Sequence, residues 1–144
     1  MTPLALFLRQ MGYQVSGSDN QPFRMSGLLE ENGIQVFPNH RAEQVGHSQL
    51  VIYSTAIPSQ NPEYQQAKRL NIRGINRLEA VSMLMNDQKM LSITGSYGKS
   101  TTTTFTVSFA NQAGLNPSYL IGADLLDFSP AKWNRGASPW FVFE

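Results

Sequence analysis

The sequence predicts an α/β fold in which helices alternate with the strands of a mainly parallel sheet. Three observations carry this prediction. Apolar residues recur with helical spacing along the 144-residue chain, short β-rich segments lie between them, and glycines stand where several helices should end. Alternation of this kind is typical of parallel sheets covered by helices.

The composition supports a globular protein and excludes several classes of partner. Hydrophobic residues make up 41% of the chain, cysteine is absent, and the formal net charge is +1. Disulfides, thiolate metal sites and charge-driven binding to nucleic acid are therefore not expected. Apolar runs are only a few residues long and no signal peptide is evident, so we expect a cytoplasmic protein without a membrane partner.

The elements of the first part follow in order. Residues 3–11 have Leu4, Leu8 and Met11 on one helical face with Phe7 beside them, and Gly12 follows as a helix end. A strand is expected at 13–19, a helix at 24–32, and strands at 34–37 and 49–54. The last of these is almost continuously apolar, which predicts burial on both faces.

A second helix–strand–helix segment follows. Asn61 is a predicted helix cap, with Pro62 at the first helical position and Glu63 in the first turn of a helix that runs to about residue 70. Residues 72–75 predict a strand and residues 77–86 a helix. The predicted inner face of that helix carries Leu78, Val81, Leu84 and Met85.

A polar connection at 86–89 marks a predicted domain boundary, after which the alternation of strands and helices resumes. We expect a strand at 90–94, a glycine loop at 95–98, a helix from 99 to about 113, and strands at 119–122 and 140–144.

The strongest chemical signal is the segment Thr94–Thr101, with the sequence TGSYGKST. A strand, a glycine loop carrying Lys and Ser, and a helix occur in the order that a triphosphate site requires, because loop N–H groups and the helix N-terminus attract phosphate. Lys99 would reach the outer phosphates and Ser100 would face Mg²⁺. The usual longer pattern has a glycine where this chain has Ile93. The alternative for the loop is a plain glycine turn with an exposed lysine. The alternative for the threonines at 101–104 is that their hydroxyls bond back to the preceding turn of the helix.

Polar residues at predicted strand ends form a second candidate set. Asp19 ends a strand where an acid commonly bonds a ribose hydroxyl, and Ser54 and Thr55 end the apolar strand at the edge where ligands bind in such sheets. Arg77 suits bidentate recognition of phosphate or carboxylate. Their alternatives are turn residues and a solvated arginine, and His40 and His47 are surface histidines by default.

These segments together resemble the Mur ligase family. The resemblance rests on the loop at 93–104 and on the segments MGYQVSGSD, STAI, NPE and NRLE, which occur in family order. It implies a Rossmann-like, parallel-sheet domain for a UDP-sugar at 1–88, lacking its first strand, followed at 89–144 by the beginning of a truncated central ATPase domain with a phosphate loop. The family opens with a further strand and a G-x-G-x-M loop, and Met1 coincides with the methionine of that motif, so we expect a start inside the ancestral reading frame.

The resemblance also implies an activity and its residues. Within the family the chain looks most like the ligases that join L-alanine to UDP-N-acetylmuramate through an acyl phosphate, using ATP and Mg²⁺ in peptidoglycan precursor synthesis. Lys99 would be catalytic, and Ser100 and Glu144 would hold Mg²⁺. The implied ATP site is Gly95, Ser96, Tyr97, Gly98, Lys99, Ser100 and Thr101, and the implied UDP-sugar site is Ser18, Asp19, His40, Ser54, Thr55 and Arg77. Tyr97 departs from the histidine usual in the alanine-adding branch.

Two other functions stay open at this point. One is the related recycling ligase, which joins UDP-N-acetylmuramate to a ready-made tripeptide and has similar first domains. The other is a non-catalytic nucleotide-binding module. The resemblance implies that 144 residues hold too little of the family's length for turnover, so we expect the chain alone to be inactive. The oligomeric state is left open.

Overall fold

The computed structural model describes residues 1–21, 25–85, 88–123, 128–134 and 136–144. The elements are α1 (Thr2–Gln10), β1 (Ser16–Ser18), α2 (Ser26–Glu31), β2 (Gln35–Phe37), the 3₁₀ helix η1 (Ala42–Val45), β3 (Leu50–Tyr53), α3 (Pro62–Arg69), β4 (Arg73–Asn76), α4 (Arg77–Leu84), β5 (Lys89–Ser92), α5 (Lys99–Gln112), β6 (Ser118–Leu120), β7 (Ala131–Lys132) and β8 (Trp140–Phe143). A mixed α/β fold is confirmed. Arg24 and Asn86, at the ends of two expected helices, lie outside the described residues.

The strands form three pieces of sheet, and most of their pairings are parallel. β1 pairs with β2 and β3 pairs with β4, both in parallel register. The third piece has the order β5-β8-β6-β7, in which only the short β7 runs antiparallel to its neighbour. β7 and η1 were not predicted, because elements of two and four residues are too short to show a period.

The expected burial of the 49–54 strand is wrong. In β3, Leu50 is 39% exposed and the other three residues are half-buried. β3 has one partner strand among the described residues, which is β4, so its other edge is open. A strand is buried on both faces only when helices and neighbouring strands cover it.

The helix starts follow the predicted capping chemistry. The Asn61 side chain accepts hydrogen bonds from the backbone N–H groups of Glu63, at 2.9 Å, and Tyr64, at 3.2 Å. Val81 on α4 and Met85, which follows the helix, are buried as expected, whereas Leu84 is partly buried and Leu78 is 71% exposed. Leu78 lies in the first turn of the helix, where an apolar residue with the correct angular position can still extend beyond the core.

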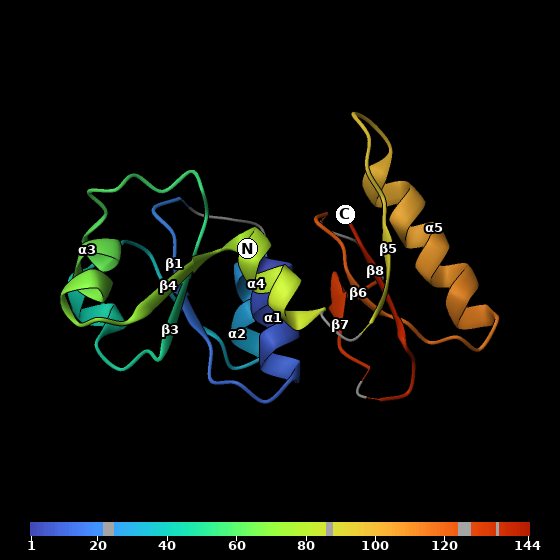
Figure 1. The fold of residues 1–144 in the computed structure, drawn as a ribbon, viewed down its shortest axis with the longest axis horizontal. Helices are drawn as coiled ribbons and strands as arrows, with labels where there is room; N and C mark the ends of the chain where they lie inside the picture. The colour runs from blue at the N-terminus through green and yellow to red at the C-terminus, as the bar shows by residue number, and fades with distance from the viewer. Residues whose placement is uncertain (22–24, 86–87, 124–127, 135) are drawn as a thin grey trace.

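Helix α1 lies in the middle of the molecule, between the β1–β4 part and the β5–β8 sheet, with α5 on the far side of that sheet (Figure 1). Leu4, Leu6 and Phe7 are buried, whereas Leu8 and Met11, which were expected on the inner face, are only partly buried. Because the helix contacts β6 and β7 on one side and α2 on the other, it buries more of its circumference than a one-sided pattern predicts.

The two predicted domains share one hydrophobic core at α1. Phe7 packs edge-on against Trp133 and Phe141, with ring centroids 5.3 and 5.4 Å apart. The Gln10 side chain donates to the Ala131 carbonyl at 3.2 Å and accepts from the Trp133 N–H at 2.6 Å. One amide thus makes two hydrogen bonds along the outer edge of β7, which is the last strand in its sheet.

Candidate functional site

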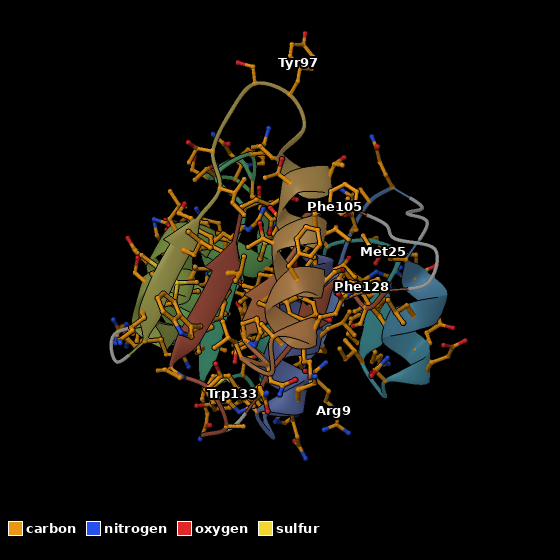
Figure 2. The ribbon with its side chains drawn as sticks, turned by 90° about the vertical axis from the view of Figure 1, so that its right-hand side faces the viewer. Arg9, Met25, Tyr97, Phe105, Phe128 and Trp133 are labelled. Carbon is orange, nitrogen blue, oxygen red and sulfur yellow. The ribbon has the colours of Figure 1, made fainter. Side chains whose placement is uncertain are left out.

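The glycine loop between β5 and α5 turns directly into the first residues of a 14-residue helix. Gly98 caps the helix with φ 74°, and Gly95 has φ 151°, backbone values that glycine adopts readily. The Lys99 ammonium donates to the Gly95 carbonyl at 2.8 Å, so the lysine side chain lies against the loop. Tyr97 is 96% exposed at the tip (Figure 2).

Two of the four threonines after the loop use their hydroxyls inside the helix. Thr103 donates to the Lys99 carbonyl and Thr104 to the Ser100 carbonyl, at 2.8 and 2.7 Å. The alternative reading of this run, hydroxyls that bond back to the preceding turn, is therefore confirmed for these two residues. Thr101 is exposed beside the loop.

Glu144 follows the last residue of β8 and contacts Ser100, in the first turn of α5. Its Oε1 accepts from the Ser100 hydroxyl and from the Gly122 N–H, each at 2.7 Å. A Cβ on Gly122 would lie 3.1 Å from that same oxygen, so glycine allows the carboxylate to reach the backbone. The structure thus brings together Ser100 and Glu144, which the sequence analysis paired as metal ligands.

The donor set at Glu144 fits a hard divalent cation. Glu144 Oε2 is buried and has no hydrogen-bond partner within the described part of the chain, an arrangement that is costly for a carboxylate unless something binds there. One carboxylate and one hydroxyl suit Mg²⁺, which usually keeps several waters and takes its other oxygens from phosphates. Among the described residues, no three His, Cys, Asp or Glu side chains gather into a metal site of their own.

An open pocket of ≈ 300 Å³ adjoins the helix start on the side of α5. It is lined by Ser100, Thr101, Thr104, Phe105 and Ala123. Figure 2 shows the Phe105 ring on the outer face of α5, below the glycine loop.

The second candidate set is only partly brought together. Ser18, the last residue of β1, and His40, in the turn after β2, are in contact, with Oγ and Nδ1 2.7 Å apart. Glu63, from the first turn of α3, joins them: its Oε2 lies 2.6 Å from Ser18 Oγ and 2.9 Å from His40 Nδ1. His40 is therefore not a free surface histidine, and Glu63 is a residue that the sequence analysis assigned only to a helix start.

Asp19 and Ser54 act as turn residues, which is the alternative given for them in place of ligand binding. Asp19 is exposed and its Oδ1 accepts from the Gln21 N–H at 3.0 Å, while Ser54 Oγ accepts from the Ala56 N–H at 3.3 Å. Thr55 is exposed. No hydrogen bond within the described residues links Ser54 or Thr55 to Ser18 or His40.

Arg77 lies near the start of α1. Burial lowers the pKa of the Met1 α-amino group, the positive charge of Arg77 lowers it further, and Asp19 opposes both effects. The charges of Arg77 and Asp19 thus both affect the N-terminal end of α1, where the helix dipole also favours an anion.

Gly122, which contacts Glu144, and Glu63, which contacts Ser18 and His40, were not predicted as residues of the candidate sites. Gly122 follows β6, so its place at the carboxyl end of a strand was a usable signal once the strand order was known. Glu63 gave no such signal, because an acid in the first turn of a helix is ordinary.

The polar side chains of both clusters lie at the carboxyl ends of parallel strands in a mixed α/β protein, a place where ligands bind in such folds. The family model described as "Mur ligase family, catalytic domain" matches residues 1–89. The chain belongs to the Mur ligase family.

Similarity to individual proteins extends over nearly the whole chain. It is 39% identical over 137 residues to the UDP-N-acetylmuramate--L-alanine ligase of Aquifex aeolicus, a match that covers 94% of this chain and 30% of that protein. The chain thus spans about a third of the length of the curated relative that it matches.

Two solved structures have the same fold. The UDP-N-acetylmuramate-alanine ligase of Thermotoga maritima matches with a TM-score of 0.90 and 24% identity, over 99% of this chain and 34% of that one. The UDP-N-acetylmuramate:L-alanyl-gamma-D-glutamyl-meso-diaminopimelate ligase of Neisseria meningitides matches with a TM-score of 0.88 and 26% identity, over 100% of this chain and 48% of that one. None of the described helices is long and apolar enough to cross a membrane.

Proposed function

We propose that this chain carries the sugar-nucleotide part and the first ATP-binding part of a ligase that joins L-alanine to UDP-N-acetylmuramate in peptidoglycan precursor synthesis. Residues 1–88 would be the Rossmann-like unit for the sugar nucleotide, and residues 89–144 the beginning of the ATPase unit with its phosphate loop. The 39% identity to a ligase of that name supports the reaction. The observation that carries the ATP assignment is the buried Glu144 Oε2 next to Ser100, an oxygen for which the described part of the chain supplies no hydrogen-bond partner.

The proposed reaction has two steps. The γ-phosphoryl group of ATP passes to the carboxylate of UDP-N-acetylmuramate, forming an acyl phosphate and ADP. The amine of L-alanine then attacks the acyl carbon, and the carbon–oxygen bond to phosphate breaks as the amide forms. Catalysis of such a phosphoryl transfer is mostly positioning and charge stabilisation.

Within this scheme the residues of the loop hold the triphosphate. Backbone N–H groups from Gly95 to Thr101 would surround phosphate oxygens, and the Lys99 ammonium would exchange its bond to the Gly95 carbonyl for a phosphate oxygen. Ser100 and Glu144 would hold Mg²⁺, which neutralises charge on the transferring phosphoryl group when it is bound. Ser18, Asp19, His40, Ser54, Thr55 and Arg77 would contact the sugar nucleotide.

Nucleotide binding tests the loop assignment. We expect Lys99→Ala to weaken MgATP binding by about tenfold or more, the equivalent of one charge-assisted contact. Isothermal titration calorimetry on the chain measures this, with Lys68→Ala, on α3, as the control. Equal affinity of Lys99→Ala and the unmodified chain would remove the glycine loop from the proposal.

A turnover assay tests whether this chain alone can catalyse the proposed reaction. The site for the amine is expected in the two thirds of the relatives' length that this chain does not span, so we expect it alone to release no phosphate from MgATP with UDP-N-acetylmuramate and L-alanine. Substrate-dependent phosphate release would contradict this expectation.

A second candidate is the tripeptide-adding ligase, because the Neisseria structure of that name covers the whole chain at 26% identity. Both candidates use UDP-N-acetylmuramate and differ in the amine. An assay of a full-length protein containing this chain, with L-alanine and with the tripeptide in parallel, separates them.

A further inference from the structure

Three polar side chains from separate elements meet at the carboxyl ends of β1 and β2. Ser18 Oγ lies 2.7 Å from His40 Nδ1 and 2.6 Å from Glu63 Oε2, and His40 Nδ1 lies 2.9 Å from the same carboxylate oxygen. The His40 and Glu63 side chains are only 13% and 16% exposed. The backbone also holds both residues, since the His40 N–H donates to Asn20 Oδ1 and the Glu63 N–H to Asn61 Oδ1.

The proton count of this cluster determines where the imidazole carries its proton. An ionised carboxylate only accepts, and a hydroxyl has a single proton to give. With the Ser18 proton donated to Glu63, an unprotonated Nδ1 would face two oxygens with no proton between them. Nδ1 therefore carries a proton and donates it to Glu63, whether the ring is neutral or charged.

The arrangement is not that of a serine nucleophile. In a nucleophilic triad the hydroxyl gives its proton to one ring nitrogen, while the carboxylate holds the other nitrogen. Here Ser18 and Glu63 both contact Nδ1. The cluster holds the ring in place and leaves the second nitrogen, Nε2, for another use.

Nε2 of His40 is open to a ligand. It makes no hydrogen bond to any residue that the structure describes, and it is not among the buried atoms without partners, which belong to Gln88, Asn111 and Glu144. Glu63 does not act simply as an acidic residue that stabilises a helix start, because its Oε2 contacts the side chains of Ser18 and His40 and not the free N–H groups of α3.

We propose that Glu63 is a positioning residue of the sugar-nucleotide site, which holds His40 as the Nδ1–H tautomer so that Nε2 accepts a hydrogen bond from a ligand hydroxyl. This inference rests on the proposed function. A neutral ring held this way offers a lone pair at Nε2, so it selects a ribose or sugar hydroxyl and not a phosphate oxygen, which needs a donor.

Nitrogen NMR of the two histidines tests the tautomer directly. At alkaline pH, where imidazoles are neutral, we expect His40 to show a protonated Nδ1 and an unprotonated Nε2 in a long-range ¹H–¹⁵N spectrum of the chain. Exposed His47 is the internal reference. Glu63→Ala should move His40 toward the tautomer mixture of His47, and Glu63→Gln, which keeps an acceptor, should restore much of the original pattern. A protonated Nε2 in the unmodified chain would overturn the inference.

Binding of UDP-N-acetylmuramate, followed in the same spectra, tests the role. We expect the His40 Nε2 signal to shift on binding, Glu63→Ala to raise Kd about tenfold, and Glu63→Gln to raise it clearly less. Exposed Glu43→Ala is the matched control and should bind as the unmodified chain does. Unchanged binding by Glu63→Ala would overturn this inference alone. No binding by the unmodified chain would overturn the sugar-nucleotide site itself and this inference with it.

Discussion

Individual residues at strand ends were the most predictable part of the candidate sites. The glycine-loop pattern named Ser100, and the family resemblance named Glu144, Ser18 and His40. In the structure Ser100 is in hydrogen-bond contact with Glu144, and Ser18 with His40. Glu63 reaches its partners from 23 and 45 residues away, so only the tertiary fold reveals its place. The resemblance thus identified pairs that are 44 and 22 residues apart, whereas Glu63 was explained by its place in a helix start and gave no sign of its distant partners.

At the same scale, Tyr119 makes stability depend on pH in the alkaline range. Burial raises the pKa of its phenol above the ordinary 10.0. The unfolded chain then releases this proton first as pH rises, so stability is full below pH 10.0 and is lost as pH rises through the folded-state pKa. We expect Tyr119→Phe to lose less unfolding free energy between about pH 9 and about pH 11 than the unmodified chain.

Urea unfolding at a series of pH values measures this difference. Tyr13→Phe is the matched control, because Tyr13 is 56% exposed. The same slope for Tyr119→Phe and the unmodified chain would contradict the argument.

Among the elements, those with clear end signals were predicted well and those defined by pairing were not. Glycine and asparagine caps marked α3 and α5 within about a residue, because capping is local. The predicted burial of β3 was wrong and β7 was not predicted, since the burial of a strand and the presence of a short one depend on which strand or helix lies beside it. Periodicity within one segment holds no information about its neighbours.

Helix α5 is built from poor helix formers, which makes its stability adjustable. Thr106 is partly exposed and its hydroxyl only donates back to the Thr102 carbonyl, at 2.8 Å. We expect Thr106→Ala to raise the free energy of unfolding by about 0.5 kcal/mol, because alanine is the better helix former. Fully buried Thr103→Ala should instead lower it by about 1 kcal/mol through a cavity. Chemical denaturation compares the two, and destabilisation by Thr106→Ala would be the contrary result.

For the whole molecule, the predicted boundary at residues 88 and 89 remains a proposal about function, while the packing is continuous across it. α1 belongs to the first part by sequence, yet Phe7 lies between Trp133 and Phe141 of the second. No local signal could show this, because the sequence reveals that a helix face is apolar and not which sheet it meets.

The Gln10 bridge between the two parts is testable. Removing its amide leaves the Trp133 N–H without this partner and takes one of two donors from the Ala131 carbonyl, which keeps a hydrogen bond from the Ser129 hydroxyl at 2.8 Å. We expect Gln10→Ala to lower the free energy of unfolding by about 1–2 kcal/mol, within the range for two modest hydrogen bonds. Circular dichroism in urea measures it, with exposed Gln14→Ala as the control. If both variants unfold alike, the bridge contributes nothing.

The edge-on pair of Phe7 and Trp133 also has an optical consequence. The chain has two tryptophans, and both belong to the second part. Trp133 lies at the junction in contact with Phe7, whereas Trp140 is 37% exposed with the Lys89 ammonium 5.5 Å from its ring centroid. In a Trp140→Phe background, the emission of Trp133 becomes an intrinsic signal for the seam between the two parts, and any ligand that loosens or tightens that seam becomes visible without a label.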